Sequence, residues 1–137
     1  MSCIFCDIVN KKAPSWTVYQ DDHVTAFFDY FPASKGHILI VPNNHYPNLF
    51  EIPEDLLAKV IGLSKNIAIF YKEKMGIEDI NIVQSNGEIA GQEVFHYHMH
   101  LVPRHKGDKV NLKWIPDESI RDEYDNLKNY ICSGLDN

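Results

Sequence analysis

Hydrophobic and polar positions change their period along the chain, and this change predicts an α+β domain. Short apolar or alternating stretches, as expected of strands, occur at residues 16–20, 24–28, 37–41, 80–84 and 94–102. The segment from Pro53 to about Met75 instead repeats its apolar residues at helical spacing, through Leu56, Leu57, Val60, Leu63, Ile67 and Phe70. Successive strands with one long helix between them predict a mainly antiparallel sheet.

Turn-forming residues and short apolar repeats predict the remaining turns and helices. Asp21-Asp22 separates the first two strands and predicts a hairpin, and Pro32–Gly36 predicts a loop. Short terminal helices are expected at Ile4–Val9 and around residues 120–131. With neither repeat nor linker in 137 residues, the sequence predicts a single domain, with a core at about residues 3–106 and a C-terminal extension at 107–137.

Composition narrows the function classes. A net charge of −6 argues against a partner that is a nucleic acid polymer, although a small anion needs only local donors. The N-terminus lacks the basic and apolar regions of a signal peptide, and no stretch approaches the roughly 20 apolar residues of a membrane span. Three cysteines without a disulfide framework are typical of a reducing compartment. We therefore expect a cytoplasmic protein.

Three histidines alternate with apolar residues at His96, His98 and His100. In a strand such spacing places all three imidazoles on one face and the apolar residues on the core side. A hydrated histidine-rich face, a metal site and phosphate chemistry are the three alternatives. Phosphate chemistry is favoured by the loop Gly87–Gln92 just upstream, because its glycines let backbone N–H groups approach an anion.

Two cysteines, Cys3 and Cys6, have the spacing of half a tetrahedral zinc site. Buried apolar cysteines or a redox pair are the alternatives, and a redox pair would call for a thioredoxin-like βαβ context.

The segment Gly91–Arg104 resembles the signature of the histidine triad family, in which three histidines alternate with hydrophobic residues. Residues 3–8, 26–29 and 36–45 resemble the family in order and spacing, so the resemblance covers roughly residues 3–106, which is most of the chain. It is closest to bacterial-type members with an N-terminal Cys-x-x-Cys. The resemblance implies a HIT-like fold, a homodimer with a shared antiparallel sheet, and cleavage or transfer at the α-phosphate of a purine nucleotide such as AMP or its derivatives.

The resemblance also implies catalytic roles. His98 would be the nucleophile, and a neutral imidazole is chemically competent for that step near pH 7. Attack would give a nucleotidyl-histidine intermediate that water hydrolyses, so that one difficult step becomes two easier ones. His100 and His37 would donate hydrogen bonds to phosphate oxygens, and Gln92 would hold the bridging or leaving atom. The chemistry itself requires no metal.

Nucleotide-binding residues follow in the same way. Asp29 matches the acid that binds the ribose hydroxyls, although a turn-forming aspartate is the alternative from sequence alone. The expected phosphate, sugar and base contacts are Gly91, Gln92, either Ser85 or Asn86, and an apolar wall of Phe5, Ile8 and Phe28, which core packing would explain equally well.

For the cysteine pair, the resemblance implies a structural zinc site completed by His45 and His96. Hydrolysis of adenosine 5′-monophosphoramidates is then the leading function. The alternative is a dinucleoside polyphosphate hydrolase, because the segments Leu101–Arg104 and Lys106–Asp108 resemble those of the family members that cleave such substrates. An alternative of another class is a zinc-stabilised nucleotide sensor or scaffold with little turnover.

Overall fold

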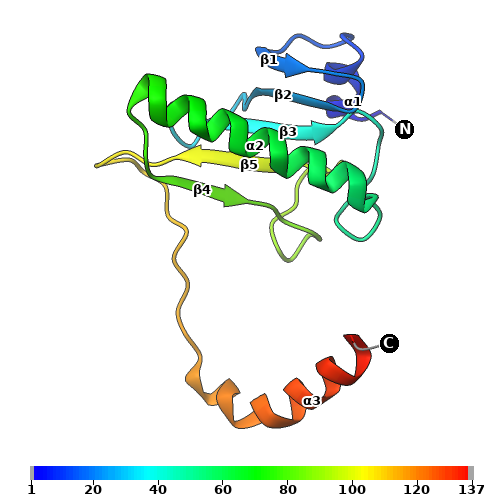
Figure 1. Ribbon diagram of the computed structural model, residues 1–137, viewed down its shortest axis with the longest axis vertical. Helices are drawn as coiled ribbons and strands as arrows, with labels where there is room; N and C mark the ends of the chain where they lie inside the picture. Colours follow the sequence, from blue (N-terminus) through cyan, green and yellow to red (C-terminus); the bar gives the residue numbers. More distant parts are fainter. Residues whose placement is uncertain (1, 136–137) are drawn as a thin grey trace.

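A five-stranded antiparallel sheet forms the centre of the computed structural model, which describes residues 2–135 (Figure 1). Its strand order is β1-β2-β3-β5-β4. The bounds are Thr17–Gln20 for β1, Val24–Phe28 for β2, Ile38–Pro42 for β3, Ile80–Val83 for β4 and Met99–Pro103 for β5. The hairpin β1-β2 and the α+β class are confirmed. None of the described helices is long and apolar enough to cross a membrane.

The two faces of the sheet carry two separate apolar clusters. Helix α2 (Glu54–Met75) lies across one face and packs on strand residues such as Ile38, Ile40 and Leu101. Helix α1 (Ile4–Val9) packs on the other face, where the cluster consists of Phe5, Val9, Phe27, Leu39 and Val41. Neighbouring strand residues point to opposite faces, so β3 serves both clusters.

Helix α2 has the predicted bounds, and Gly76 ends it in the left-handed conformation at φ 67°. Its buried positions are Val60, Ser64 and Tyr71. The expectation that Phe70 belongs to the apolar stripe is wrong, because its side chain is 55% exposed. Tyr71 takes the inward position one residue later.

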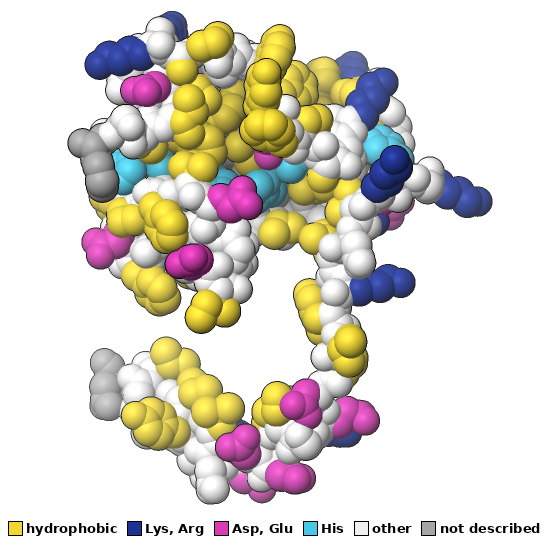
Figure 2. All heavy atoms as spheres, turned by 180° about the vertical axis from the view of Figure 1, so that it is seen from behind, with side chains coloured by type: hydrophobic (Ala, Val, Ile, Leu, Met, Phe, Trp, Pro, Cys, Tyr) yellow, Lys and Arg dark blue, Asp and Glu magenta, His cyan; other side chains and the backbone are white. Residues whose placement is uncertain are grey.

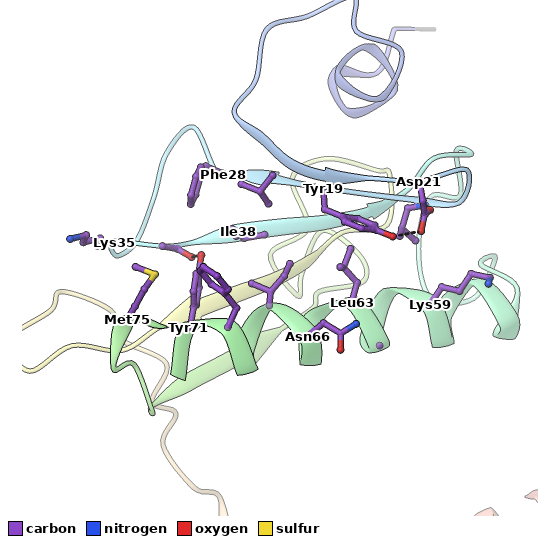
Figure 3. Close-up of a pocket in the computed structure, with 16 residues that line it drawn as sticks. Tyr19, Asp21, Phe28, Lys35, Ile38, Lys59, Leu63, Asn66, Tyr71 and Met75 are labelled. Atoms are coloured by element: carbon purple, nitrogen blue, oxygen red, sulfur yellow. Dashed lines mark hydrogen bonds between the residues drawn. The ribbon is translucent and has the colours of Figure 1, made fainter. Parts of the chain in front are cut away.

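Tyr71 joins the helix to the loop before β3. Its hydroxyl donates to the carbonyl oxygen of Gly36 at 2.9 Å. Both residues line an open cavity of about 840 Å³ between α2 and the β1-β2 hairpin (Figure 3). Burial raises the pKa of Tyr71 to about 12. Gly36 has φ +93°, and a Cβ there would lie 3.1 Å from Cγ of Pro103. Only glycine therefore allows this approach of loop and strand.

Strand β5 is shorter than the predicted Val94–Val102, so that prediction is wrong for residues 94–98. The ladder with β3 runs only as far as Ile40 opposite Met99. Continuing it would bring Pro42 opposite Tyr97, and proline has no N–H for a ladder hydrogen bond. Tyr97 instead donates its backbone N–H to the carbonyl of Tyr46 at 2.7 Å.

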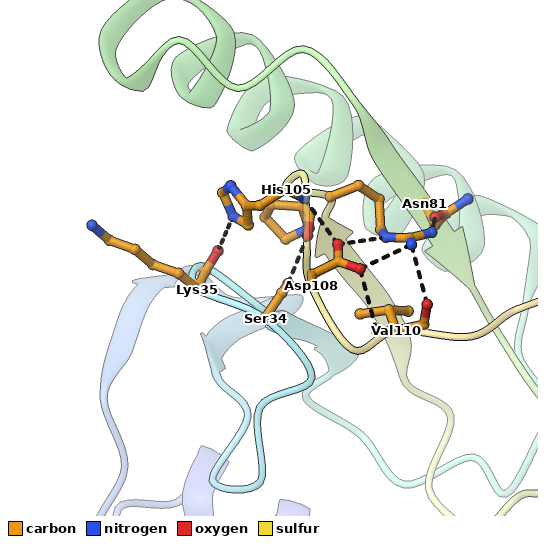
Figure 4. Close-up of polar contacts among 8 residues, drawn as sticks. Ser34, Lys35, Asn81, His105, Asp108 and Val110 are labelled. Carbon is orange, nitrogen blue, oxygen red and sulfur yellow. Dashed lines mark hydrogen bonds and ion pairs between the residues drawn. The ribbon is translucent and has the colours of Figure 1, made fainter.

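The exit from β5 is fixed by a polar cluster around Arg104 (Figure 4). Arg104 donates two hydrogen bonds to Asp108, at 2.9 and 3.0 Å, and one each to Asn81 and the Val110 carbonyl. These bonds hold the pKa of the Asp108 carboxyl well below its usual range. Beyond Val110 the chain continues as an arm with the 3₁₀ helix η1 (Glu118–Glu123) and α3 (Tyr124–Leu135), neither of which has a buried residue.

Candidate active site and metal centre

The histidines meet on the face of the sheet that α1 covers. Figure 2 shows them as a band of imidazoles crossing the domain, with hydrophobic side chains gathered along it. A cavity of about 330 Å³ opens there. Its lining unites residues from α1, β2, β3 and the segment before β5, and it includes the predicted site residues Phe5, Ile8, Phe28, Asp29, Gly91, His98 and His100.

The protonation of His98 is set by the backbone. Nδ1 of His98 lies 2.8 Å from the carbonyl oxygen of His96. A carbonyl oxygen can only accept, so Nδ1 carries the hydrogen and the neutral ring has its lone pair on Nε2. Burial lowers the pKa of His98 below the ordinary value of 6.5, which favours the neutral ring. Phe5 packs edge-on against the imidazole, with ring centroids 5.1 Å apart.

A second chain of hydrogen bonds fixes the other two imidazoles. The backbone N–H of Ala33 donates to Nδ1 of His37 at 3.0 Å, so the hydrogen of neutral His37 is on Nε2. That nitrogen donates to Nδ1 of His100 at 2.9 Å, which places the hydrogen of His100 on Nε2. Asp29 lies beside both rings, its Oδ2 being 3.4 Å from His37 and 3.9 Å from His100. His37 is only 5% exposed and does not line the cavity, whereas His100 and Asp29, which lie beside its Nε2, do.

Burial, followed by the charges of His98 and His37, lowers the pKa of His100 to about 4. Because the unfolded chain takes up this proton near pH 6.5, the folded protein should lose stability as the pH falls from 6.5 towards 4. His100 contributes about 2–3 kcal/mol to this loss of stability, a figure that allows for its partial exposure.

Thermal unfolding measured between pH 4.5 and 7 should therefore show a Tm that falls as the pH falls. The slope should be smaller in His100→Asn and unchanged in His23→Asn, which alters an exposed histidine. Equal slopes in all three proteins would contradict the prediction.

Four predicted metal ligands converge beside this site. Nδ1 of His96 lies 3.5 Å from Sγ of both Cys3 and Cys6, and Nδ1 of His45 lies 3.4 Å from Sγ of Cys6. Bonds of about 2.3 Å to sulfur and 2.0–2.1 Å to nitrogen give a tetrahedral sulfur–nitrogen edge of about 3.5 Å. The donor set and its spacing thus fit zinc.

The tautomer of His96 agrees with this fit. Its Nε2 lies 2.8 Å from the carbonyl oxygen of Pro42 and therefore carries the hydrogen, so the lone pair on Nδ1 faces the thiols. Burial, together with Cys3, raises the pKa of the Cys6 thiol to about 11. A bound cation would be needed to hold that sulfur as a thiolate at neutral pH.

Asp29, His37 and His100 form a second group with close ligand atoms, all within 4.8 Å of one another. This group does not fit a metal. The Ala33 N–H points at Nδ1 of His37, so Nε2 must keep its hydrogen and has no lone pair for a cation.

Gln92, Ser85 and Asn86 do not line the cavity. Gln92 is 3% exposed and braces its own loop: Oε1 accepts from the Gly87 N–H, and Nε2 donates to the carbonyls of Pro47 and Val94. Asn86 accepts from the Leu49 N–H and bonds to Gln84. Direct substrate contacts by these three side chains remain predictions, and for Gln92 and Asn86 they would require exchange of these bonds.

Part of the cavity lining was not predicted from the sequence. Phe27 and Leu39 belong to the wall, and Trp16, Tyr30 and Phe31 stand at the mouth. The last two were detectable, because two aromatic residues directly after Asp29 and before Pro32 are unexpected in a solvent-exposed turn. Phe28 borders both this cavity and the one under α2.

Comparison with known proteins gives the same family as the site does. The family model of the HIT domain matches residues 10–107 of this chain. The chain is 40% identical to Protein hit of Bacillus subtilis, over 98% of this chain and 94% of that protein. It is 33% identical to the adenosine 5′-monophosphoramidase HNT1 of Saccharomyces cerevisiae, over 98% of this chain and 84% of the relative.

Solved structures of other proteins have the same fold as this chain. SMU.412c of Streptococcus mutans superposes with a TM-score of 0.89 at 34% identity, covering 98% of this chain and 85% of that one. A Zn-bound histidine triad family protein of Mycobacterium smegmatis gives a TM-score of 0.76 at 34% identity, over 99% and 96% of the two chains. With His98 and His100 in one cavity, His96 beside the cysteine pair, and the HIT domain matched over most of its length, the chain belongs to the histidine triad (HIT) family.

Proposed function

We propose that the protein hydrolyses adenosine 5′-monophosphoramidates through a nucleotidyl-histidine intermediate on His98. The observation that carries the proposal is the hydrogen bond from Nδ1 of His98 to the His96 carbonyl, which directs the lone pair to Nε2 in an apolar cavity. The names of two relatives support a nucleotide hydrolase, and the first of them supports the phosphoramidate. One is the yeast monophosphoramidase, and the other is the adenylylsulfatase HINT3 of Arabidopsis thaliana, 36% identical over 77% of this chain and 54% of that protein.

In the first step Nε2 of His98 attacks the α-phosphorus. The P–N bond to the amine breaks, and the amine leaves with a proton taken from water, which becomes hydroxide. A second water then attacks the same phosphorus, the bond to Nε2 breaks, and AMP and neutral His98 result, together with a proton that neutralises the hydroxide. A neutral imidazole suits both steps, since it is a nucleophile in the first and a leaving group in the second.

His100 stabilises the phosphate through its Nε2–H, and His37 acts by holding His100 in that tautomer. Asp29 is the proposed acceptor for the ribose hydroxyls, and Phe5 and Ile8 form the wall for the base. Zinc on Cys3, Cys6, His45 and His96 would be structural, because four protein ligands leave no open position for substrate. A homodimer that pairs through the edge strand β4 also belongs to this proposal.

The test offers adenosine 5′-monophosphoramidate and diadenosine tetraphosphate to the same preparation and compares kcat/KM. We expect the phosphoramidate to be preferred and mass spectrometry of the quenched reaction to detect an AMP adduct. A reversed preference would identify the polyphosphate hydrolase instead. Nucleotide binding with neither turnover nor adduct would mean that the protein is a sensor or scaffold.

A further inference from the structure

The C-terminal arm carries an apolar stripe that stays exposed in the single chain. The stripe consists of residues that recur every three or four positions along α3 and therefore share one face: Tyr124, Leu127, Ile131 and Leu135. Between 47% and 79% of each of these side chains is exposed. A helix of 12 residues is marginal in water on its own, because most helical stability comes from packing of the apolar face. The stripe therefore calls for a surface on which it can pack.

An apolar surface of suitable shape is the open groove between α2 and the β1-β2 hairpin, which we call the α2 groove (Figure 3). Its lining includes Val18, Phe70 and Met75, whose side chains are half-exposed. The α2 residues that line it run from Lys59 to Met75, about 24 Å at 1.5 Å per residue, whereas α3 is about 18 Å long. The groove is thus long enough for an amphipathic helix that lays its apolar face against it.

The charges of the two surfaces are complementary. Lys35 and Lys59 line the α2 groove, together with Asp21, whose carboxylate already accepts hydrogen bonds from the N–H groups of His23 and Val24. Residues 117–135 of the arm carry more acids than bases, namely Asp117, Glu118, Asp122, Glu123 and Asp125 against Arg121 and Lys128. Opposite charges at the margins of an apolar contact favour association and fix its orientation.

The path of the arm points to a second copy of the chain. The hairpin strand β1 and the strand β4 form opposite edges of the sheet, and the arm leaves from β5, next to β4. The start of the arm is fixed by the bonds of Arg104 to Asp108 and to the Val110 carbonyl. From there the arm runs past β4, away from the hairpin of its own chain (Figure 1), so that its apolar stripe is left to a neighbour beyond that edge.

The arm is long enough to reach the α2 groove of a copy that pairs through β4. The groove opens over β3, which contributes Ile38 to its lining. In a sheet continued through two β4 edges, β3 of the second copy lies four strand positions from β5, about 19 Å at roughly 4.8 Å per strand. Residues 111–117, which precede η1, span up to roughly 23 Å when extended.

We propose that two copies of the chain exchange their arms, so that the apolar stripe of each α3 packs into the α2 groove of the other copy. The inference rests on the homodimer that belongs to the proposed function and is independent of the hydrolytic step. Packing buries Phe70 and Met75, which are exposed in the single chain, and brings the acids of the arm to the side of Lys35 and Lys59. Exchange of an identical element between protomers is a low-cost route to a dimer.

Amide hydrogen exchange of residues 118–135 tests the packing. The amides of α3 should exchange slowly in the wild-type protein. Ile131→Glu should raise their exchange rates at least about tenfold, because it puts a charge into the apolar groove, and Phe70→Glu should do the same from the groove side. Asn129→Glu is the matched control, because it adds the same charge to the opposite face of the same helix. Fast exchange of α3 in the wild type, or equal rates in the Ile131→Glu and Asn129→Glu proteins, would overturn the proposal.

Covalent linking identifies the chain that supplies the groove. Phe70→Cys places a thiol in the α2 groove, and Cys132 is an exposed native thiol on α3. A short bismaleimide should link the two thiols into a product with the mass of a dimer. In a mixture of unlabelled and ¹⁵N-labelled chains, the linked peptides should include pairs of one light and one heavy partner. Adding Cys132→Ser should remove the product. A link between the two thiols in a product of monomer mass would mean that the arm folds back on its own groove, and it would refute the exchange.

Light scattering distinguishes this inference from the proposed function. The full chain should be a dimer, and Ile131→Glu should raise its dissociation constant about 100-fold, or about tenfold for each of the two arms. A protein that hydrolyses no nucleotide but gives the interchain link supports the exchange and fails the hydrolase. A dimer with the same dissociation constant in the wild type and in Ile131→Glu would keep the pairing through β4 and reject the exchange of arms. A monomer at every concentration would reject both.

Discussion

Replacing His98 by glycine should lower kcat for adenosine 5′-monophosphoramidate by about 10⁴- to 10⁶-fold, because the substitution removes the atom that forms the intermediate. The AMP adduct should disappear from the mass spectrum at the same time. Binding of AMP should change little, since the apolar wall and Asp29 come from other elements. Steady-state kinetics and intact-protein mass spectrometry measure both effects.

The cavity left by glycine also permits a rescue experiment. Free imidazole can occupy that space and attack the phosphorus, so added imidazole should restore part of the turnover in His98→Gly. His23→Asn is the control for loss of a histidine, because His23 is exposed and outside the site. Wild-type turnover in the glycine variant would rule out His98 as the nucleophile.

Loss of the metal centre should produce the second large effect. We expect elemental analysis to find about one zinc per chain, and Cys6→Ser to lose it. Binding of zinc to the folded chain alone should stabilise the domain by about 2–3 kcal/mol, so the Tm of the variant should fall on the order of 10 °C. Cys132→Ser is the matched control, because Cys132 is an exposed free cysteine on α3.

The same variant should lose activity without losing the nucleophile. His96 links the two sites, since its Nδ1 faces the thiols and its carbonyl accepts from Nδ1 of His98. Freeing His96 should loosen that acceptor, and we expect kcat to fall about tenfold while KM for the nucleotide changes less. A Cys6→Ser protein with the wild-type Tm and no zinc in either preparation would refute the metal centre.

Several features could be predicted from sequence because they depend on neighbouring residues. The long helix and its stop at Gly76 follow from local periodicity and from the freedom of glycine at positive φ. The prediction that the apolar residues alternating with the histidines face the core is confirmed, because Tyr97, Met99 and Leu101 are all buried. The spacing of Cys3 and Cys6 predicted half of a metal site and the resemblance added His45 and His96, and the structure brings the four donor atoms together.

Other features depend on residues far apart in sequence. Periodicity assigned Phe70 to the core and extended β5 back to Val94, but packing selected Tyr71, and the ladder stops opposite Ile40. Gln92 was predicted to contact the substrate because it is a polar residue in a glycine-containing loop. In the structure its side chain instead bonds to Gly87, Pro47 and Val94 and stabilises that loop. Trp16 likewise stacks on Tyr30 only because β1 and β2 pair.

The sequence by itself determined which side chains are candidates for the chemistry: three alternating histidines, a cysteine pair and an acid after β2. Only the tertiary structure decided which nitrogen of each imidazole is available. A neutral imidazole places its hydrogen according to its hydrogen-bond partner. Those partners are the Pro42 carbonyl for His96, the Ala33 N–H for His37 and the His96 carbonyl for His98. Their positions depend on the path of the folded backbone, which no local pattern of residue types encodes.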